Sequence, residues 1–298
     1  MEKIKITFLG TSDSIPTKTR NHTSILLSYK NENIMIDCGE GTQRQLKLAN
    51  ISPCSLSRIL ITHWHGDHIL GLPGLFQTLG MLGYPKKLKI YGPRNTNHYM
   101  ELIKKFVNVE IDLEVHEVEN KEILNEPEFI IKTSSMSHNT PTNAYSFIIK
   151  DKMRLDKNKL KKLKLPNSPL LKNLQQGKDI TFNNKKIKAS QVTYLEKGRK
   201  ITFILDTIMN ENAPLLAKDS DILICESSFS KEDNEKAKEF KHLTAENAAS
   251  IAKKANARSL ILTHVSQRYQ FQLDKIEKEA KKTFKNTLLA KDFQVIEC

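Results

Sequence analysis

The chain has 298 residues, of which 39% are apolar and 27% charged, and these proportions suit a folded α/β domain that carries an insertion. No apolar run approaches the roughly 18 residues of a membrane-spanning helix, and the N-terminus lacks the long apolar core of a signal peptide, so we expect a cytoplasmic protein without membrane contact. The four cysteines form no C-x-x-C pair, which argues for reduced thiols and against a cysteine zinc site.

The net charge of +13 is concentrated in one segment of the chain. Residues 151–200 contain 15 Lys and Arg against 4 Asp and Glu, a net charge of +11, whereas the remainder is close to balanced. A basic patch attracts polyanions and gives salt-dependent affinity for phosphate backbones. The alternative is a lysine-rich surface without a partner, because lysine is common throughout the chain.

Short β-branched runs alternate with helical patterns along most of the chain. The predicted elements, in chain order, are strands at 4–9, 23–29 and 33–38, a helix at 42–49, a strand at 58–62, a helix at 70–82, a strand at 88–91, a helix at 96–107, strands at 129–133, 144–149, 201–205 and 222–225, a helix at 244–255, a strand at 259–263 and a helix at 275–284. Strands separated by helices favour an α/β architecture. The pattern alone does not distinguish a doubly wound parallel sheet from a two-sheet sandwich. Residues 151–200 interrupt the alternation and are predicted to be an insertion.

A histidine-rich loop follows the strand predicted at 58–62. Its ligand-type residues are His63, His65, Asp67 and His68. Imidazole and carboxylate groups are suitable zinc ligands, and one zinc ion takes about four of them. In extended chain the first two histidines point to the same side, while the turn after them redirects the other two residues. This arrangement suggests two adjacent metal ions.

Three more candidate ligands follow apolar strands. They are His138, Asp206 and His264. A single histidine at a strand end is more often structural, but several such ends together favour a metal site. We expect one metal ion on His63, His65, His138 and Asp206, and a second on Asp67, His68, His264 and a bridging Asp206. A water between two cations would have its pKa lowered toward neutrality.

The segment H-W-H-G-D-H at 63–68 matches the H-x-H-x-D-H signature of the metallo-β-lactamase superfamily, and the later order His, Asp, His also fits. This resemblance implies an αββα four-layer sandwich with two Zn²⁺ ions at the strand ends. The alternation of elements had left two architectures open, a doubly wound parallel sheet and a two-sheet sandwich, and the resemblance favours the second. Manganese or iron remains an alternative for a mixed His/Asp site.

Further segments resemble the transfer-RNA 3′-end processing endonucleases (tRNase Z) in particular. They are F-L-G-T at 8–11, P-T-K-T-R-N at 16–21, D-C-G-E-G-T-Q at 37–43, S-H at 137–138 with Pro141 and Tyr145, and T-H at 263–264 with Arg268 and Tyr269. The resemblance implies an endoribonuclease that cuts precursor tRNA after the discriminator nucleotide and leaves 3′-hydroxyl and 5′-phosphate ends. It also implies a homodimer.

The same resemblance assigns roles to individual residues. Asp67 would accept the proton of the attacking water, and His242 backed by Glu226 would protonate the leaving 3′ oxygen. Lys18, Arg20 and Asn21 would lie near the acceptor end of the RNA. The basic segment 151–200 lies where this family has a protruding arm that grips the elbow of tRNA.

The sequence departs from the family pattern at several positions. Leu205 replaces a glycine before Asp206, Ser168 replaces a glycine in the arm, and Cys225 replaces a histidine before Glu226. The change at Ser168 puts details of elbow recognition in doubt, but every candidate ligand is present. Two alternative functions stay open: a hydrolase of small esters or lactones on the same fold, and an RNA-binding module without catalysis.

Overall fold

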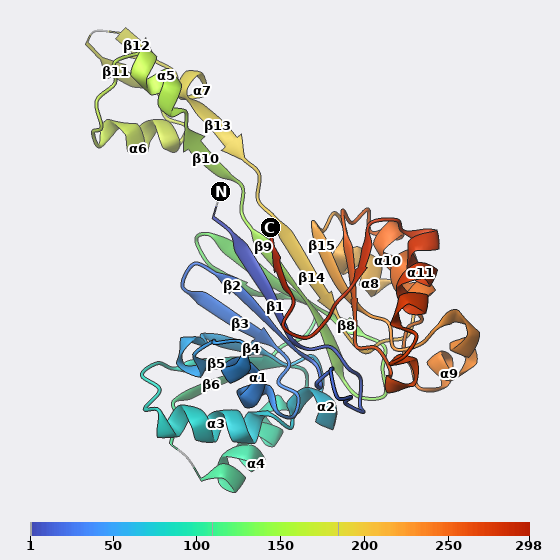
Figure 1. Ribbon diagram of the computed structural model, residues 1–298. Coiled ribbons are helices and arrows are strands. Elements are labelled where there is room, and N and C mark those ends of the chain that lie inside the picture. The colour runs from blue at the N-terminus through green and yellow to red at the C-terminus, as the bar shows by residue number, and fades with distance from the viewer. Residues whose placement is uncertain (1, 109, 184) are drawn as a thin grey trace. The chain divides into compact units, whose positions relative to one another are not determined.

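The computed structural model describes residues 2–108, 110–183 and 185–298 (Figure 1). The chain divides into two compact units. The larger one, here called the core unit, comprises residues 1–125, 131–147 and 200–298. The smaller one, here called the basic unit, comprises residues 126–130 and 148–199.

The first sheet of the core unit has seven strands in the order β18-β1-β2-β3-β4-β5-β6. Their bounds are Val295–Glu297, Ile4–Gly10, Ser24–Tyr29, Glu32–Ile36, Arg58–Leu60, Leu88–Gly92 and Leu113–Glu117. The strands from β18 to β3 pair antiparallel, and those from β3 to β6 pair parallel. The parallel part places the carboxyl ends of β3 and β4 at one edge of the sheet.

The second sheet also has seven strands, in the order β17-β16-β15-β14-β9-β8-β7. Their bounds are Thr287–Leu289, Leu260–Thr263, Ile222–Glu226, Lys200–Ile204, Thr142–Ile149, Phe129–Met136 and Glu122–Asn125. β14 to β17 pair parallel, and their residues are largely apolar and buried. Continuous apolar runs are typical of strands that are covered on both faces.

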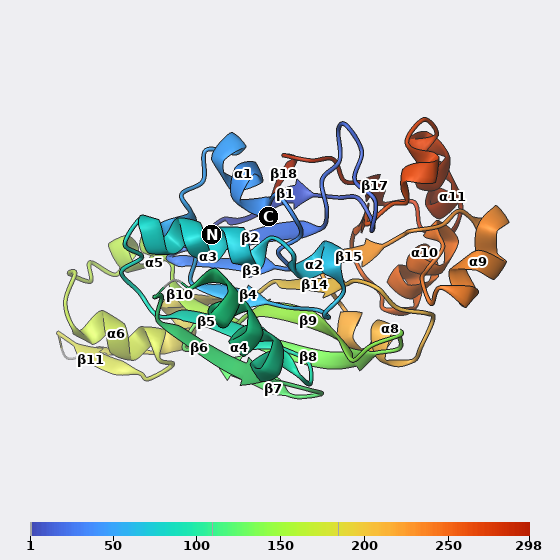
Figure 2. The ribbon, with the colours of Figure 1, turned by 90° about the horizontal axis from the view of Figure 1, so that it is seen from below.

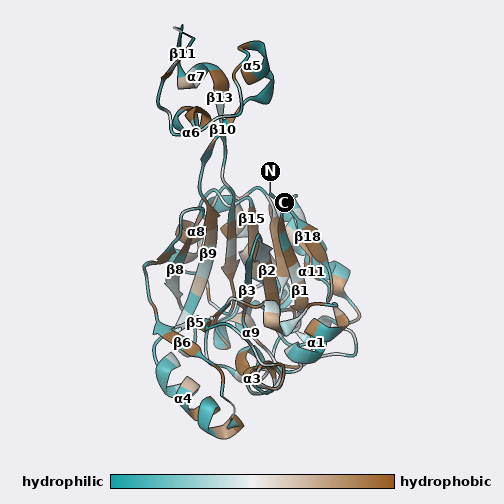
Figure 3. Ribbon diagram, turned by 90° about the vertical axis from the view of Figure 1, so that its left-hand side faces the viewer, coloured by the Kyte–Doolittle hydropathy of each residue, from teal (hydrophilic) through white to brown (hydrophobic). Residues whose placement is uncertain are grey.

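The two sheets lie face to face, and helices cover their outer faces (Figures 1 and 2). Across the interface, the Tyr145 hydroxyl donates a hydrogen bond to the Ile61 carbonyl, and the rings of Tyr29 and Phe147 meet edge to face with centroids 5.8 Å apart. Figure 3 shows that the strands between the helices are mostly apolar. The αββα four-layer sandwich expected from the family resemblance is therefore confirmed.

Separate apolar clusters lie between each sheet and its helices. The first sheet packs against α1 (Thr42–Leu48), α3 (Leu72–Met81) and α4 (Thr96–Val107). The second sheet packs against α8 (Asn212–Ala217), α10 (Ala245–Lys254) and α11 (Leu273–Thr283). The remaining short helices of the core unit are η1 (Pro53–Ser55), α2 (Gly66–Ile69), η2 (Lys231–Asp233), α9 (Asn234–Glu239) and η3 (Gln267–Tyr269).

The basic unit has elements that the sequence pattern did not predict. β10 (Lys152–Leu155) pairs antiparallel with β13 (Thr193–Glu196), and β11 (Ile180–Phe182) pairs antiparallel with β12 (Lys185–Ile187). Three short helices accompany them: α5 (Lys157–Lys162), α6 (Leu170–Gln175) and α7 (Ala189–Val192). Their apolar side chains form a small core of their own, made of Leu160, Leu174, Ile180, Ile187, Ala189 and Val192.

The predicted strands and helices of the core unit are all present, with ends that differ by at most three residues. The pattern missed β6, β7, β17, β18, α8 and α9, which are short or only partly buried. Among the described residues, no helix is long and apolar enough to cross a membrane.

Candidate metal centre

The histidine-rich loop begins at His63, three residues after the end of the buried strand β4. His65 is the residue that precedes α2, and its backbone is extended, with φ −76° and ψ 149°. His63 and His65 both lie on the chain between β4 and α2, and their Nε2 and Nδ1 atoms are 3.0 Å apart. Asp67 and His68 lie in the first turn of α2, where the chain has changed direction. The change of direction sends these two side chains to a second group of ligands.

The first group consists of His63, His65, His138 and Asp206, whose ligand-type atoms lie within 4.8 Å of one another. His138 Nε2 is 3.2 Å from His65 Nδ1. Asp206 Oδ2 is 3.4 Å from His63 Nε2 and 3.8 Å from His138 Nε2. These four residues come from the ends of β4, β8 and β14, which the sandwich brings to one edge.

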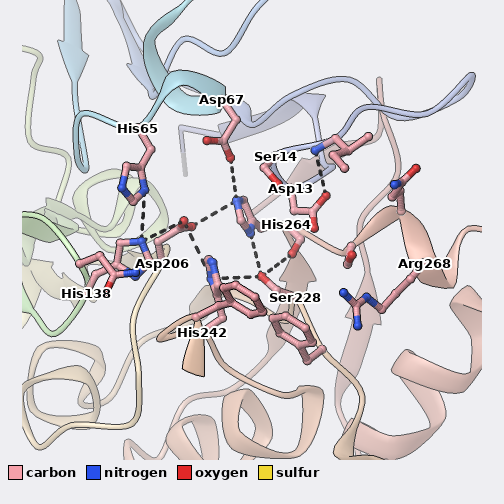
Figure 4. Close-up of a pocket in the computed structure, with 16 residues that line it drawn as sticks. Asp13, Ser14, His65, Asp67, His138, Asp206, Ser228, His242, His264 and Arg268 are labelled. Atoms are coloured by element: carbon pink, nitrogen blue, oxygen red, sulfur yellow. Dashed lines mark hydrogen bonds and ion pairs between the residues drawn. The ribbon is translucent and has the colours of Figure 1, made fainter. Parts of the chain in front are cut away.

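The second group consists of Asp67, His68, Asp206 and His264. The Nε2 atoms of His68 and His264 are 3.1 Å apart. Asp206 Oδ1 is 3.4 Å from His68 Nε2 and 3.2 Å from His264 Nε2, and Asp67 Oδ2 is 3.2 Å and 3.4 Å from the same two atoms. Asp206 thus turns one carboxylate oxygen toward each group, and Figure 4 shows it between His138 and His264.

The two groups have the properties that bound metal ions require. Pairs of unprotonated imidazole nitrogens repel each other at 3.0–3.2 Å, but ligands of a tetrahedral zinc ion lie about 3.3 Å apart because each bond is about 2.0–2.1 Å long. Asp206 Oδ1 is buried and has no hydrogen-bond donor. Burial holds the pKa of His63 well below its usual range, so its lone pair is free. The residues therefore fit two metal ions that share Asp206.

Asp37 orients the second group from behind. Its Oδ2 atom lies 2.7 Å from His68 Nδ1, and the same carboxylate accepts hydrogen bonds from the Thr62 backbone N–H and hydroxyl. Gly39, two residues later, has no side chain to clash with the Asp67 carbonyl, which would lie 2.4 Å from a Cβ atom there. A carboxylate behind a histidine fixes which ring nitrogen faces the metal. The sequence contained Asp37 within a recognised motif, but nothing in the spacing predicted its contact with His68.

Two other ligand histidines are oriented in the same way. His138 Nδ1 lies 2.9 Å from the Lys241 carbonyl, so this nitrogen donates and leaves Nε2 unprotonated. His264 Nδ1 lies 2.9 Å from the Ser228 hydroxyl, which itself donates to Glu226 Oε2 at 2.7 Å. Ser228 therefore joins a candidate ligand to a buried carboxylate, a role that the sequence did not predict.

Glu226 and His242 form a pair at the edge of the second group. His242 Nδ1 is 3.2 Å and 3.1 Å from the two carboxylate oxygens of Glu226, and the Thr207 backbone N–H also donates to Glu226. Burial of His242 opposes its charged form, but the carboxylates of Glu226 and Asp206 outweigh this effect and raise its pKa to about 9. His242 can therefore carry a proton at neutral pH.

A cavity of about 410 Å³ opens over both groups. Its lining includes His65, Asp67 and His242 from the candidate centre, together with Arg268 (Figure 4). Phe240 also lines it. The cavity therefore has candidate metal ligands and a candidate proton donor on its walls, as a hydrolytic site requires.

The three residues predicted to bind RNA lie in different environments. Lys18 is exposed. The Asn21 side chain donates to the Glu40 carbonyl, and its backbone N–H donates to Asp292. Arg20 is buried, and its guanidinium donates to the carbonyls of Thr11 and Ala290. The geometry assigns Arg20 to holding the loop in place, since two of its guanidinium nitrogens already donate to carbonyls inside the protein.

Comparisons with known proteins agree with this geometry. A Ribonuclease Z of Methanosarcina acetivorans is 36% identical over 99% of this chain and 98% of its own. A Ribonuclease Z of Nanoarchaeum equitans is 38% identical over 98% of this chain and 92% of its own. Residues 4–167 match the family model described as anti-Pycsar protein Apyc1. Among solved structures, the short form of human tRNase Z covers 98% of both chains with 26% identity and a TM-score of 0.70. The metallo-β-lactamase fold protein YhfI of Bacillus subtilis covers 100% of both chains with 18% identity and a TM-score of 0.72, which shows the fold alone.

Fold and site together define a hydrolytic enzyme of the metallo-β-lactamase fold. The two Ribonuclease Z relatives align with nearly the whole chain at 36% and 38% identity, so the family within this fold can also be assigned. The chain belongs to the ribonuclease Z family.

Proposed function

We propose that the protein is a zinc-dependent endoribonuclease that removes the 3′ trailer of precursor tRNA. It cuts after the discriminator nucleotide and leaves a 3′-hydroxyl on the tRNA and a 5′-phosphate on the trailer. The relatives' common name, Ribonuclease Z, supports the substrate class. The observation that carries the chemistry is the position of Asp206, with one oxygen facing each of two ligand groups.

The two groups would each hold one Zn²⁺ ion. His63, His65 and His138 would bind the first, Asp67, His68 and His264 would bind the second, and Asp206 would bind both. Two zinc ions supply a water of lowered pKa and neutralise charge on the phosphate. Asp37, Ser228 and the Lys241 carbonyl keep the ligand histidines in the required orientation.

Two groups of the protein transfer protons in this proposal. Asp67 lines the cavity, and its carboxylate accepts the proton released when water attacks the phosphorus. His242, which also lines the cavity, donates a proton to the leaving 3′ oxygen. Glu226 favours the charged form of His242 and fixes the ring so that Nε2 is free to donate.

Contacts with the RNA lie outside the metal centre. The exposed Lys18 can reach a phosphate near the acceptor end, and the basic unit supplies a surface for the tRNA backbone.

Association of two copies is also part of the proposal. It is supported by the exposed apolar side chains of Met81 and Leu82 at the end of α3 and of Phe106 on α4. Sedimentation analysis that shows only monomers at micromolar concentration would rule this association out.

The proposed activity can be tested with a precursor tRNA that carries a 3′ trailer and a labelled 5′ end. Zinc-loaded wild-type protein should give a single cut after the discriminator nucleotide, and His65→Ala should give none because the first ligand group is incomplete. If zinc-loaded wild type leaves the precursor intact but hydrolyses a small ester or lactone, the substrate assignment is wrong while the hydrolytic fold stands.

A further inference from the structure

Phe240 places an exposed aromatic ring on the wall of the catalytic cavity. The side chain is 49% exposed, and the residue follows directly after α9. Several other aromatic side chains are exposed in the part of the chain that the structure describes, but of these only Phe240 lines the cavity. An apolar ring that stays exposed beside a catalytic centre is a candidate contact for substrate.

The ring is held by its neighbours. Phe229 lies parallel to Phe240, with an interplanar angle of 2° and centroids 6.4 Å apart, and it is only 5% exposed. The Arg268 guanidinium lies 5.0 Å from the centroid of Phe229 and pairs with Asp233 at 3.7 Å. Phe240 thus presents a supported flat surface, which costs little entropy when a planar partner stacks on it.

The same turn of backbone positions Phe240 and the proton donor His242. The Phe240 N–H donates to the Lys236 carbonyl, and the His242 N–H donates to the Ala237 carbonyl. The ring centroids of His242 and Phe229 are 6.0 Å apart. The aromatic surface therefore lies on the side of the cavity where the leaving 3′ oxygen receives its proton.

We propose that Phe240 stacks on the base of the discriminator nucleotide, which is the nucleotide that bears the leaving 3′ oxygen. This inference rests on the proposed endoribonuclease function and on the role of His242. Stacking on an aromatic ring accepts any base, because every base has a π face. It would hold the unpaired discriminator in place beside His242, and no hydrogen bond would have to read its identity.

The most direct test is a fluorescence measurement on the cleavage product, which needs no turnover. A tRNA cleavage product that ends in 2-aminopurine at the discriminator position is titrated with zinc-loaded protein. Wild type should quench the fluorescence, Phe240→Trp should also quench it, and Phe240→Leu should not, since leucine keeps an apolar side chain without a π face. Phe271→Leu, at an exposed phenylalanine between η3 and α11 that does not line the cavity, serves as the matched control and should behave as wild type.

A second measurement uses a precursor whose discriminator lacks its base. On the normal precursor, Phe240→Leu should lower kcat/KM by roughly 5- to 150-fold, the range for loss of one stacked base. On the precursor without the base, wild type and Phe240→Leu should be equally slow. Moving the abasic position to the first trailer nucleotide should restore the difference between the two proteins.

The possible results separate this inference from the proposed function. If wild type cleaves the precursor and Phe240→Leu quenches and cleaves as wild type does, the stacking proposal is overturned and the function stands. A Phe240→Leu defect that persists in full on the abasic precursor also overturns it, because the ring would then act without the base. If wild type neither binds the product nor cleaves the precursor, the proposed function fails, and the stacking proposal fails with it.

Discussion

Three residues of the centre have backbone torsions that residues other than glycine rarely adopt. Asp37, Asp206 and His264 have φ values of 57°, 40° and 54°. Each of these residues follows a buried strand directly or within two positions, and each aims its side chain into the centre. The left-handed region costs about 1 kcal/mol or more for such residues. The surrounding packing must therefore offset this cost to keep the ligand atoms together.

Removing the Ser228 hydroxyl should weaken metal binding without removing a ligand. Ser228→Ala leaves His264 Nδ1 and one oxygen of Glu226 without their shared partner. We expect zinc affinity at the second group to fall by about 10- to 100-fold, the usual effect of losing an orienting partner. Competition with a zinc chelator measures this affinity. Ser228→Thr keeps the hydroxyl and should bind zinc as tightly as wild type does. If both variants bind zinc equally weakly, the hydroxyl does not orient His264 as proposed.

The rate of cleavage should decline at alkaline pH as His242 loses its proton. The pKa of His242 is raised to about 9, so the donor is protonated at neutral pH and its contribution is lost as pH rises through about 9. Glu226→Gln removes the main charge that favours the protonated ring. The decline should then begin at lower pH in single-turnover assays. An identical pH profile for wild type and Glu226→Gln would show that His242 is not the titrating donor.

Parallel strands bring the chemistry of this protein to one edge of the sandwich. Asp37, His63, Asp206, Glu226 and His264 all lie at or just after the carboxyl ends of strands, in segments far apart along the chain. Ligands bind beyond the carboxyl ends of parallel strands in many α/β folds. The strands that bear these residues are largely buried, so the site is built on rigid supports.

Arg20 is expected to stabilise the loop between β1 and β2. Arg20→Ala removes two charged hydrogen bonds to buried carbonyls of Thr11 and Ala290, which should lower the free energy of unfolding by about 2–3 kcal/mol. Lys18→Ala, at an exposed position of the same loop, should change stability by less than about 0.5 kcal/mol and weaken RNA binding instead. Urea denaturation of both variants measures the loss of stability, and KM for the precursor measures the loss of RNA binding. If the two variants are equally stable, Arg20 does not have the structural role assigned to it.

The sequence predicted the core elements better than the contacts between them. The strands around 58–62 and 259–263 are continuous apolar runs, and both are present as β4 and β16. The contact between Asp37 and His68 spans 31 positions and depends on a positive φ, which no local pattern indicates. The elements of the basic unit escaped prediction because their helices have six residues or fewer and their strands only three or four.

At the scale of the whole molecule, the candidate metal centre and most of the positive net charge lie in different compact units. The candidate ligands all lie in the core unit, whereas residues 151–200, almost all of them in the basic unit, carry most of the net charge. The basic unit has its own apolar cluster, and the two clusters of the core unit that contact the outer helices contain none of its residues. The two units should therefore be separable by deletion.

Deleting most of the basic unit should weaken RNA binding and leave the metal centre intact. The Ile149 N–H donates to the Arg199 carbonyl at 2.8 Å, so a Gly-Gly turn can replace residues 151–198. Precursor binding should fall by more than about tenfold, and its logarithmic dependence on salt should become shallower, because fewer phosphates are neutralised. Zinc content should not change. An unaltered salt dependence would show that this surface does not contact the tRNA backbone.

The account depends most on the claim that Asp206 joins two metal ions. Anomalous diffraction at the zinc edge from crystals of the zinc-loaded protein tests this claim directly. We expect two peaks about 3.5–4 Å apart, one among His63, His65 and His138 and the other among Asp67, His68 and His264, with Asp206 bonded to both. A single peak, or two peaks of which only one contacts Asp206, would contradict the two-metal centre proposed for this enzyme.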